Sequence, residues 1–332
     1  MGRVLEFTDM PSIISYSSIV GKKEASGPLG EFFDMRLNDD KFGEKTWEQA
    51  ESKMQKSAVT KALKKLCLSP GDIDIICAGD LLNQCISSSF GLRGFNIPFF
   101  GLYGACSTMA EAMIAASVSI ASGLANTAAA VTSSHFCSAE RQFRFPLEYG
   151  GQRPQSAQWT VTGSGAVVLS RREGDFPKIK RCMVGKIIDF GICDMSNMGA
   201  AMAPAAATSL IEFFKDTNTA VKDFDLILTG DLGKVGTSLL YELMDGEGMD
   251  IRYNHNDCGL MIFDLQTQDV HSGGSGCGCS ASVLCGHILP LMNKGRYKNI
   301  LFCATGALMS TVSSQQGESI PGICHIVNIV KE

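Results

Sequence analysis

The chain has 332 residues, of which 45% are hydrophobic and 19% are charged, and its formal net charge is −5. This composition is typical of a well-buried globular protein, and the length predicts two domains or one duplicated domain. The negative charge gives no electrostatic reason to expect nucleic acid as a partner. The sequence contains no apolar stretch of the roughly 18 residues that a membrane span needs, and it does not begin like a signal peptide.

The first predicted helix begins at a capping box, Thr46 to Gln49, and continues with apolar residues at helical spacing as far as Leu66. Ser69-Pro70-Gly71 ends it and leads into a predicted buried strand at 73–79. Further along, Gly104-Ala105-Cys106-Ser107 opens a predicted helix over 106–122 that is apolar on nearly every side. Such a helix is expected to be packed on all faces.

Two parts of the sequence repeat one pattern. Residues 73–81 and 224–232 are both short apolar runs that end in Gly-Asp, and Asp80 and Asp231 lie 151 residues apart. The first run is followed by a small-residue helix at 106–122 and by strand-like runs at 127–132 and 165–169. The second run is followed in the same order by a helix at 279–292 and by strand-like runs at 300–305 and 323–330. The order strand, loop, helix, strand, written twice, predicts two similar α/β halves, 1–172 and 173–332.

The cysteines are numerous, 13 in all, but they are scattered through apolar surroundings. A reduced, buried thiol packs as a small hydrophobic group, so we expect structural cysteines in a cytoplasmic protein rather than a disulfide scaffold. Cys277 and Cys279 lack the second pair of ligands that a zinc site needs, and no metal site is predicted.

Cys106 at the start of a buried helix, with a glycine-rich loop in the second half, resembles the thiolase and ketoacyl-synthase superfamily. Several less common motifs resemble the stage V sporulation protein AD family of spore-forming bacteria. These motifs are Gly-Asp-Leu-Leu-Asn-Gln at 79–84, Gly-Ala-Cys-Ser-Thr at 104–108, Ser-Ala-Glu-Arg-Gln-Phe-Arg at 138–144, Glu-Tyr-Gly-Gly-Gln at 148–152, Met-Ala-Pro-Ala-Ala at 202–206 and His-Asn-Asp-Cys-Gly-Leu-Met at 255–261.

The resemblance implies a thiolase-like duplicated α/β fold in five layers, α-β-α-β-α, with helices 106–122 and 279–292 side by side between two sheets. It implies binding of dipicolinic acid (pyridine-2,6-dicarboxylate), alone or as its calcium chelate, for uptake into the developing spore. Membrane proteins of the same sporulation operon are the implied partners, at the forespore or spore inner membrane. The superfamily also implies a homodimer, and the resemblance implies no further cofactor.

The catalytic set of a condensing enzyme is incomplete in this sequence. Such enzymes support the acyl group on their cysteine with His, or with His and Asn, from the second half. Here Asp231 occupies the place of one such His, and an ionised carboxylate cannot donate a hydrogen bond to an oxyanion. The loop 273–279 contains neither His nor Asn. We therefore expect a protein that is not an enzyme, with Cys106 as a vestigial nucleophile.

The residues present suit binding of a small acid. A helix N-terminus at Cys106 offers backbone N–H groups, and guanidinium groups can grip carboxylates. The predicted ligand-binding residues are Asp80, Cys106, His135, Arg141, Arg153, Asp231, Lys234 and His255, with Arg144 as a further source of charge. Arg141 and Arg144 fit an ion pair with Glu140 or Glu148 equally well.

Asp80 and Asp231 allow more than one interpretation. They could contact the pyridine region of the ligand, hold its calcium ion, or cap the loops that follow their strands. Two other functions also stay open for the chain. It could be an active acyl-thioester condensing enzyme that uses Cys106, with His135 or His255 as its base. It could instead be a structural subunit of a membrane transport complex with a vestigial pocket.

Overall fold

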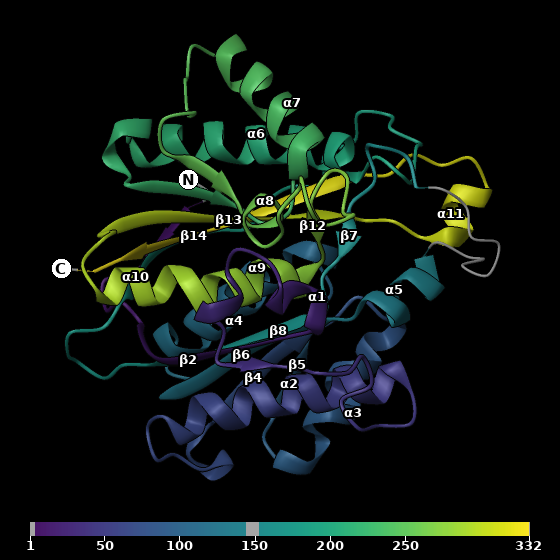
Figure 1. Cartoon of the computed structure of the whole chain (residues 1–332). Helices are drawn as coiled ribbons and strands as arrows, with labels where there is room; N and C mark the ends of the chain where they lie inside the picture. Colours follow the sequence, from purple (N-terminus) through teal and green to yellow (C-terminus); the bar gives the residue numbers. More distant parts are fainter. Residues whose placement is uncertain (1–3, 144–152, 332) are drawn as a thin grey trace.

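The structure is a computed structural model that describes residues 4–143 and 153–331. The first half of the chain forms a sheet of five main strands with helices on both faces (Figure 1). In sheet order these strands are β2 (Ser12–Val20), β8 (Gly163–Ser170), β6 (Thr127–Ser134), β4 (Ile75–Gly79) and β5 (Phe99–Gly101). The helices of this half are α1 (Lys22–Ala25), α2 (Trp47–Lys64), α3 (Ile86–Leu92), α4 (Thr108–Ala121) and α5 (Phe136–Phe143).

The second half repeats this arrangement. Its main strands, in the corresponding order, are β9 (Lys178–Met183), β14 (Gly322–Val330), β13 (Asn299–Ala307), β10 (Leu226–Thr229) and β11 (His255–Asp257). Its helices are α6 (Met198–Thr217), α7 (Gly233–Gly246), α8 (Cys258–Met261), α9 (Cys277–Val283), α10 (Leu289–Asn293) and α11 (Thr311–Gln315). The short strands of the chain are β1 (Val4–Glu6), β3 (Met35–Arg36), β7 (Trp159–Thr160) and β12 (Gly274–Ser275).

The two sheets have matching topology. In each, the first three strands run antiparallel and the last two run parallel to the third. The sheets meet at one residue pair, Ser12 on β2 and Lys178 on β9. The predicted division between residues 172 and 173 falls in the turn between β8 and β9; as a domain boundary it stays a prediction.

Five layers follow from this arrangement, as the sequence predicts. Helices α2 and α3 cover the outer face of the first sheet, α6 and α7 cover the outer face of the second, and α4, α9 and α10 lie between the sheets (Figure 1). Helices α4 and α9 are in contact in the middle layer, as expected. The main apolar core, which includes Met109, Met113 and Ile120 of α4, lies in this layer, and two further cores lie under the outer helices.

The helix expected at 279–292 differs in detail. It begins two residues earlier, at Cys277, and a π-helical turn at Leu284–Ile288 separates α9 from α10. Pro290, in the first turn of α10, has no N–H group to donate along a regular helix, so the ladder of helical hydrogen bonds is interrupted here.

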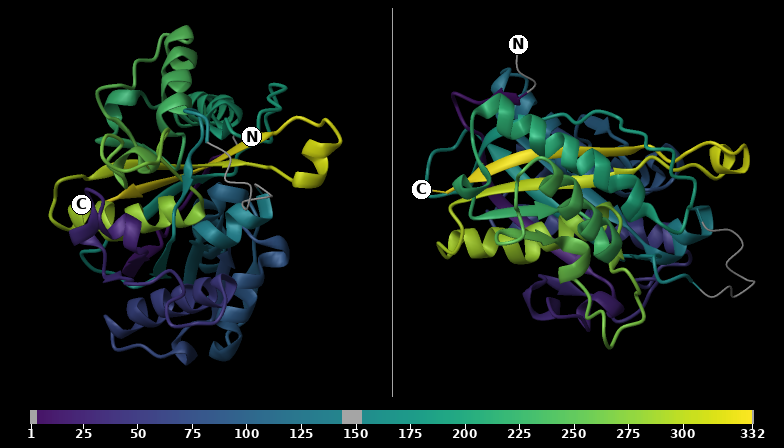
Figure 2. Two further views of the ribbon diagram at one scale, coloured as in Figure 1. Left: turned by 45° about the vertical axis from the view of Figure 1, so that its right-hand side comes forward. Right: turned by 90° about the horizontal axis from the view of Figure 1, so that it is seen from above.

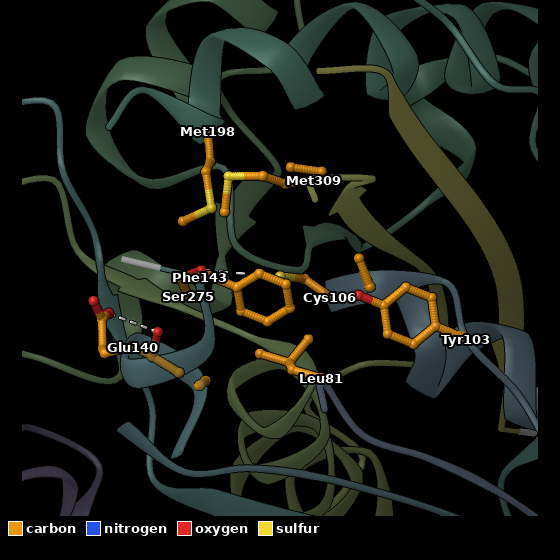
Figure 3. Close-up of a pocket in the computed structure, with 12 residues that line it drawn as sticks. Leu81, Tyr103, Cys106, Glu140, Phe143, Met198, Ser275 and Met309 are labelled. Atoms are coloured by element: carbon orange, nitrogen blue, oxygen red, sulfur yellow. Dashed lines mark hydrogen bonds between the residues drawn. The ribbon is translucent and has the colours of Figure 1, made fainter. Parts of the chain in front are cut away.

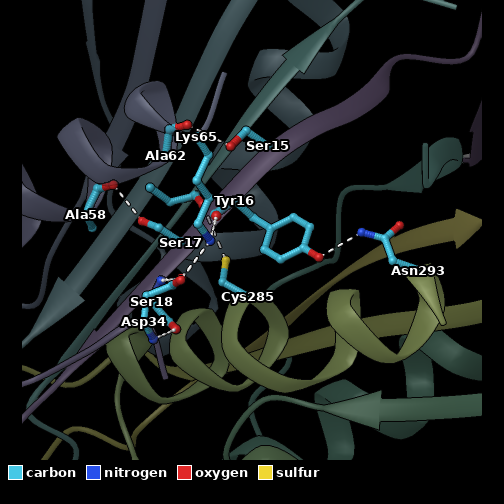
Figure 4. A network of polar contacts seen from close by, with 11 residues as sticks. Ser15, Tyr16, Ser17, Ser18, Asp34, Ala58, Ala62, Lys65, Cys285 and Asn293 are labelled. Carbon is cyan, nitrogen blue, oxygen red and sulfur yellow. Dashed lines mark hydrogen bonds and ion pairs between the residues drawn. The ribbon is translucent and has the colours of Figure 1, made fainter. Parts of the chain in front are cut away.

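Buried hydroxyl groups fix the outer helix of the first half to its sheet. Ser15 and Ser17 project from the same face of β2 and donate hydrogen bonds to the carbonyl oxygens of Ala62 and Ala58 on α2, at 2.7 and 2.6 Å (Figure 4). Alternate residues of a strand share a face, and residues four apart share a helix face, so the two spacings match. The contact sets the position of α2 above the first sheet.

The segment that carries α11 leaves the end of β13 and returns into β14, and it projects from the body of the molecule (Figure 2). Met309 lies at its start, beside the pocket described below. Within the described residues, no helix combines the length and the apolar character that crossing a membrane requires.

Candidate functional site

A pocket lies where the two halves meet, at the N-terminal end of α4 (Figure 3). Its volume, including space that is open to solvent, is about 410 Å³. The residues that line it are mostly apolar and come from both halves. They are Leu81, Tyr103, Ala105, Cys106, Ala139, Glu140, Phe143, Thr160, Met198, Ser275, Ala307 and Met309.

Cys106 stands in a tight turn just before α4. The residues Ala105–Ser107 form a short 3₁₀ turn, and Ala105 has a φ of 51°, a left-handed conformation that is uncommon for a residue with a side chain. Thr108 supports the turn, because its hydroxyl donates to the carbonyl of Ala105 at 2.6 Å and accepts from the N–H of Gly104 at 3.1 Å. The turn thereby presents the Cys106 side chain to the pocket.

Asp231 lies near the Cys106 thiol, close enough for its carboxylate to raise the pKa of that thiol. The carboxylate is fully buried. Its Oδ2 accepts the N–H of Gly276 and its Oδ1 accepts the hydroxyl of Thr305, both at 2.9 Å. Ser275 Oγ lies 3.9 Å from the sulfur of Cys106. Cys106, Ser275 and Asp231 therefore form one buried polar group at the pocket; that Asp231 stands in the place of a catalytic His stays a prediction.

This environment keeps the thiol protonated. Burial is the main cause that raises the pKa of Cys106 well above its usual range, and the charge of Asp231 raises it further. Since the thiolate is the nucleophile, a cysteine in this state is a poor one. Burial also raises the pKa of Asp231, although the donors from Gly276 and Thr305 oppose that shift.

Asp80, the counterpart of Asp231 in the repeat, has a different role. One oxygen accepts the N–H of Leu82 at 2.9 Å, and the other accepts the N–H and hydroxyl of Ser88 at 2.8 and 2.5 Å. It thus caps the loop after its strand, which is one of the interpretations that the sequence allows. Asp80 does not line the pocket, although the next residue, Leu81, does.

The structure does not bring the predicted cations to the pocket lining. Arg141 pairs with Glu48, a partner other than those expected, and lies over the ring of Trp47. Arg153 pairs with Asp269 at 3.3 Å. Lys234 is exposed in the first turn of α7, and Arg144 and Glu148 lie outside the described residues.

The two candidate histidines also lie away from the pocket lining. His135 is buried, and its Nε2 contacts the carbonyl oxygen of Asp40 at 2.6 Å. His255 lies on β11, at the edge of the second sheet, with Thr229 and Tyr241 as its hydrogen-bond partners at 3.0 and 2.9 Å. Neither ring reaches Cys106 as a hydrogen-bonded base, and burial lowers the pKa of both.

Several pocket residues were not predicted as ligand contacts. Tyr103, Phe143, Met198 and Met309 supply much of the wall in Figure 3, and Glu140 accepts the hydroxyl of Thr160 at 2.9 Å. Glu140 and Phe143 lie in the motif at 138–144, which could have directed attention to them, whereas Tyr103, Met198 and Met309 lie outside every quoted motif, so sequence patterns give no signal for these three. No group of three or more His, Cys, Asp or Glu side chains that could hold a metal ion occurs in residues 4–143 and 153–331.

Solved structures with a similar architecture include proteins from two bacteria. One is 3-oxoacyl-(acyl-carrier-protein) synthase III from Aquifex aeolicus VF5, with a TM-score of 0.58 and 14% identity, covering 96% of this chain and 99% of that chain. Another is a variant of OleA from Xanthomonas campestris bound with cerulenin, with a TM-score of 0.65 and 15% identity, covering 98% of each chain. At this identity the likeness concerns the fold alone, which is thiolase-like.

Sequence comparison is more specific. A family model described as Stage V sporulation protein AD (SpoVAD) matches residues 2–330. The chain is also 46% identical over 311 residues to Stage V sporulation protein AD of Bacillus subtilis (strain 168), and this match covers 94% of the chain and 91% of that protein. The chain belongs to the stage V sporulation protein AD family.

Proposed function

We propose that this protein is a non-catalytic member of the thiolase fold that binds dipicolinic acid in the Cys106 pocket during sporulation. The observation that carries the proposal is the burial of Cys106 near the carboxylate of Asp231. A nucleophilic cysteine needs a base or a cation that favours its thiolate, whereas a neighbouring carboxylate favours the thiol. The pocket keeps the shape of a site for a small molecule, with a cysteine that is held in its unreactive form.

The lining suits a flat, largely apolar ring. Leu81, Phe143 and the two methionines, Met198 and Met309, form apolar walls around the mouth in front of Cys106 (Figure 3). Met side chains are flexible, so they can move aside to make room for a ligand. Hydroxyl groups and the Cys106 thiol then offer hydrogen bonds at the edges.

The charge of the pocket favours a neutralised ligand. None of the described residues that line it is Lys or Arg, whereas Glu140 lines it and Asp231 adjoins it. A free dianion would be repelled by these carboxylates, so calcium, bound to the ligand as a chelate, is the companion ion we propose. The protein would supply few coordinating atoms to the calcium ion, because dipicolinic acid itself supplies most of them.

We place this activity in uptake of dipicolinic acid into the developing spore. The membrane proteins of the same sporulation operon are the proposed partners, with this chain bound peripherally at the forespore or spore inner membrane. Membership of a sporulation family supports this setting. A structural subunit with an unused pocket would share the setting but would not bind the acid.

Calorimetric titration with dipicolinate, with and without calcium, tests the proposal. We expect saturable binding of one ligand per chain, tighter with calcium. Cys106→Ser should retain binding, because the hydroxyl is similar in size, whereas Cys106→Leu should fold but block the pocket, because added methylenes overfill a packed site. Absence of heat with both forms of the ligand would contradict the proposal and favour the structural subunit.

Mass spectrometry of the intact protein after incubation with acyl-CoA tests the remaining alternative. The protonated thiol beside Asp231 predicts no acyl adduct. A stoichiometric adduct on Cys106 that turns over when a second substrate is added would identify a condensing enzyme instead.

A further inference from the structure

The motif His255-Asn256-Asp257 has no part in the pocket lining, yet it contains a carboxyl group that is fully buried. Asp257 Oδ2 accepts the hydroxyl of Thr229 at 2.7 Å and the N–H of Leu232 at 2.8 Å. Its Oδ1 accepts the N–H of Gly233 at 3.0 Å. Two of these donors belong to the turn that directly follows Asp231, the carboxylate beside Cys106.

Other hydrogen bonds hold the flanks of this turn, since Asp231 accepts from Gly276 and Thr305 and the N–H of Lys234 donates to the carbonyl of Ser272 at 2.7 Å. Gly233 has a φ of 63°, a backbone conformation that residues with a side chain rarely adopt. A Cβ atom at Gly233 would also lie 2.4 Å from the carbonyl oxygen of Ser272. Hydrogen bonds to an ionised carboxylate are stronger than those between neutral groups, so Asp257 is well suited to hold Leu232 and Gly233, and through them Asp231.

Asp257 is itself held by a series of hydrogen bonds in which each side chain donates to the next, from Tyr241 through His255 and Thr229 to Asp257. Thr229 has a single hydroxyl proton, which it donates to Asp257, so it accepts from His255 Nε2 at 3.0 Å. His255 is then the tautomer that carries its proton on Nε2, and its Nδ1 accepts from the hydroxyl of Tyr241 at 2.9 Å. Burial lowers the pKa of His255 to about 4, which is consistent with a neutral ring. Tyr241, on α7, is partly exposed.

We propose that Asp257, supported by Thr229, His255 and Tyr241, is a positioning residue for Asp231, and that it thereby influences both the state of the Cys106 thiol and the affinity of the pocket for its ligand. The part that concerns the ligand rests on the proposed function. The part that concerns Cys106 does not, because the reactivity of a thiol is measurable without any ligand.

Thr229 offers a matched pair of variants. Thr229→Val keeps the shape but removes the hydroxyl that links His255 to Asp257, whereas Thr229→Ser keeps the hydroxyl. The readout is the rate at which iodoacetamide alkylates Cys106, followed by peptide mass spectrometry. A displaced Asp231 no longer raises the pKa of Cys106 as strongly, so the rate should rise about tenfold in Thr229→Val and stay within about twofold in Thr229→Ser, in proportion to the thiolate fraction.

The same variants are titrated with dipicolinate. With calcium present, we expect the Kd of the chelate to rise about tenfold in Thr229→Val, because a displaced Asp231 alters the environment of Cys106 in the pocket, and to change little in Thr229→Ser. If the wild type binds no dipicolinate, the proposed function fails, and the alkylation rates still decide the role of Asp257.

Two controls keep the test decisive. Cys285 is buried in the main core and takes no part in the hydrogen bonds from Tyr241 to Asp257. It must stay unalkylated in every variant, which shows that the fold is intact. Should Thr229→Val fail to fold, Tyr241→Phe is the alternative variant, because it removes only the hydroxyl that bonds to His255. This smaller disturbance of the same hydrogen-bond network should raise the alkylation rate of Cys106 about threefold. If Thr229→Val or Tyr241→Phe folds and the alkylation rate of Cys106 stays the same as in the wild type, the proposal is overturned.

Discussion

At the scale of single residues, this chain buries carboxyl groups against neutral donors. Glu24 is 1% exposed, and its Oε1 accepts the N–H of Thr162 at 2.9 Å. Burial is the main cause that raises the pKa of Glu24 from 4.5 to about 7. The pKa of Asp257 is raised to about 6, again mainly by burial. Each such group favours its protonated form more in the folded protein than in the unfolded chain.

The Glu24 carboxyl predicts a specific dependence of stability on pH. Because its pKa is raised by folding, its contribution is fully present below about pH 4.5 and is lost as the pH rises through about 7. Glu24→Gln keeps the acceptor oxygen but cannot ionise. The unfolding free energy of the wild type, relative to this variant, should therefore fall by about 3 kcal/mol between about pH 4.5 and about pH 8.

Urea unfolding of both proteins across this pH range measures the difference. Glu247→Gln, at an exposed acid in the turn after α7, is the control and should show no such trend. A difference between wild type and Glu24→Gln that is the same at every pH would contradict the burial argument.

Asp80 and Asp231 show how far the sequence determines the site. The repeat predicts equivalent positions, and the structure confirms that each follows a buried strand. Asp80 finds its partners within eight residues, at Leu82 and Ser88, so a local cap could be predicted. The donors to Asp231, Gly276 and Thr305, are 45 and 74 residues away, and local patterns cannot identify such partners.

At the scale of helices and strands, close packing in the middle layer depends on glycine. A Cβ atom at Gly278 of α9 would lie 2.3 Å from the carbonyl oxygen of Gly163 and 2.7 Å from the backbone nitrogen of Ser134. Backbone atoms of a central sheet cannot move aside as the end of a flexible side chain can. The distance between α9 and the first sheet is therefore set by this residue.

Gly278→Ala should destabilise the protein by about 2–3 kcal/mol, as overpacking of a core does. Gly246→Ala is the matched control, because nothing lies within 4 Å of its Cβ position at the end of α7. That change should leave the stability the same or raise it by up to about 1 kcal/mol. Thermal unfolding followed by circular dichroism compares them, and equal melting temperatures would refute the close contact.

Helices were predicted correctly where the apolar pattern of a single segment is enough to identify them. The apolar pattern at 106–122 predicts a buried helix, and α4 is one, after the 3₁₀ turn that carries Cys106. The positions of charged side chains at the ends of elements were harder to predict. Arg141 was expected at the ligand or beside Glu140 or Glu148, but it lies on α5 against Glu48, since the direction of its side chain depends on how α5 packs near the start of α2.

At the scale of the whole molecule, strand β5 forms an edge of the first sheet with no further strand paired to it in residues 4–143 and 153–331. Strand β5 is the last strand in the order of the first sheet, and Phe99 and Phe100 on it are 43% and 50% exposed. An unpaired edge with apolar side chains is a ready template for pairing with another strand. The homodimer that the superfamily resemblance implies is accordingly proposed to pair through β5.

Phe100→Lys tests this, because a charge on an edge strand opposes pairing. Size-exclusion chromatography with light scattering should give a dimer for the wild type and a monomer for Phe100→Lys. Phe190→Lys, at a side chain that is 65% exposed elsewhere on the surface, should remain a dimer. A monomeric wild type, or a dimeric Phe100→Lys, would contradict the proposed interface.

The central claim is that dipicolinic acid binds in the Cys106 pocket, where the two halves of the molecule meet. Protection of Cys106 from alkylation tests both together, because the thiol lines that pocket. With dipicolinate and calcium at about ten times the Kd, the alkylation rate of Cys106 should fall about tenfold, since a bound pocket excludes the reagent. The exposed thiol of Cys193 should react at an unchanged rate. Equal rates at Cys106 with and without the ligand would contradict the account.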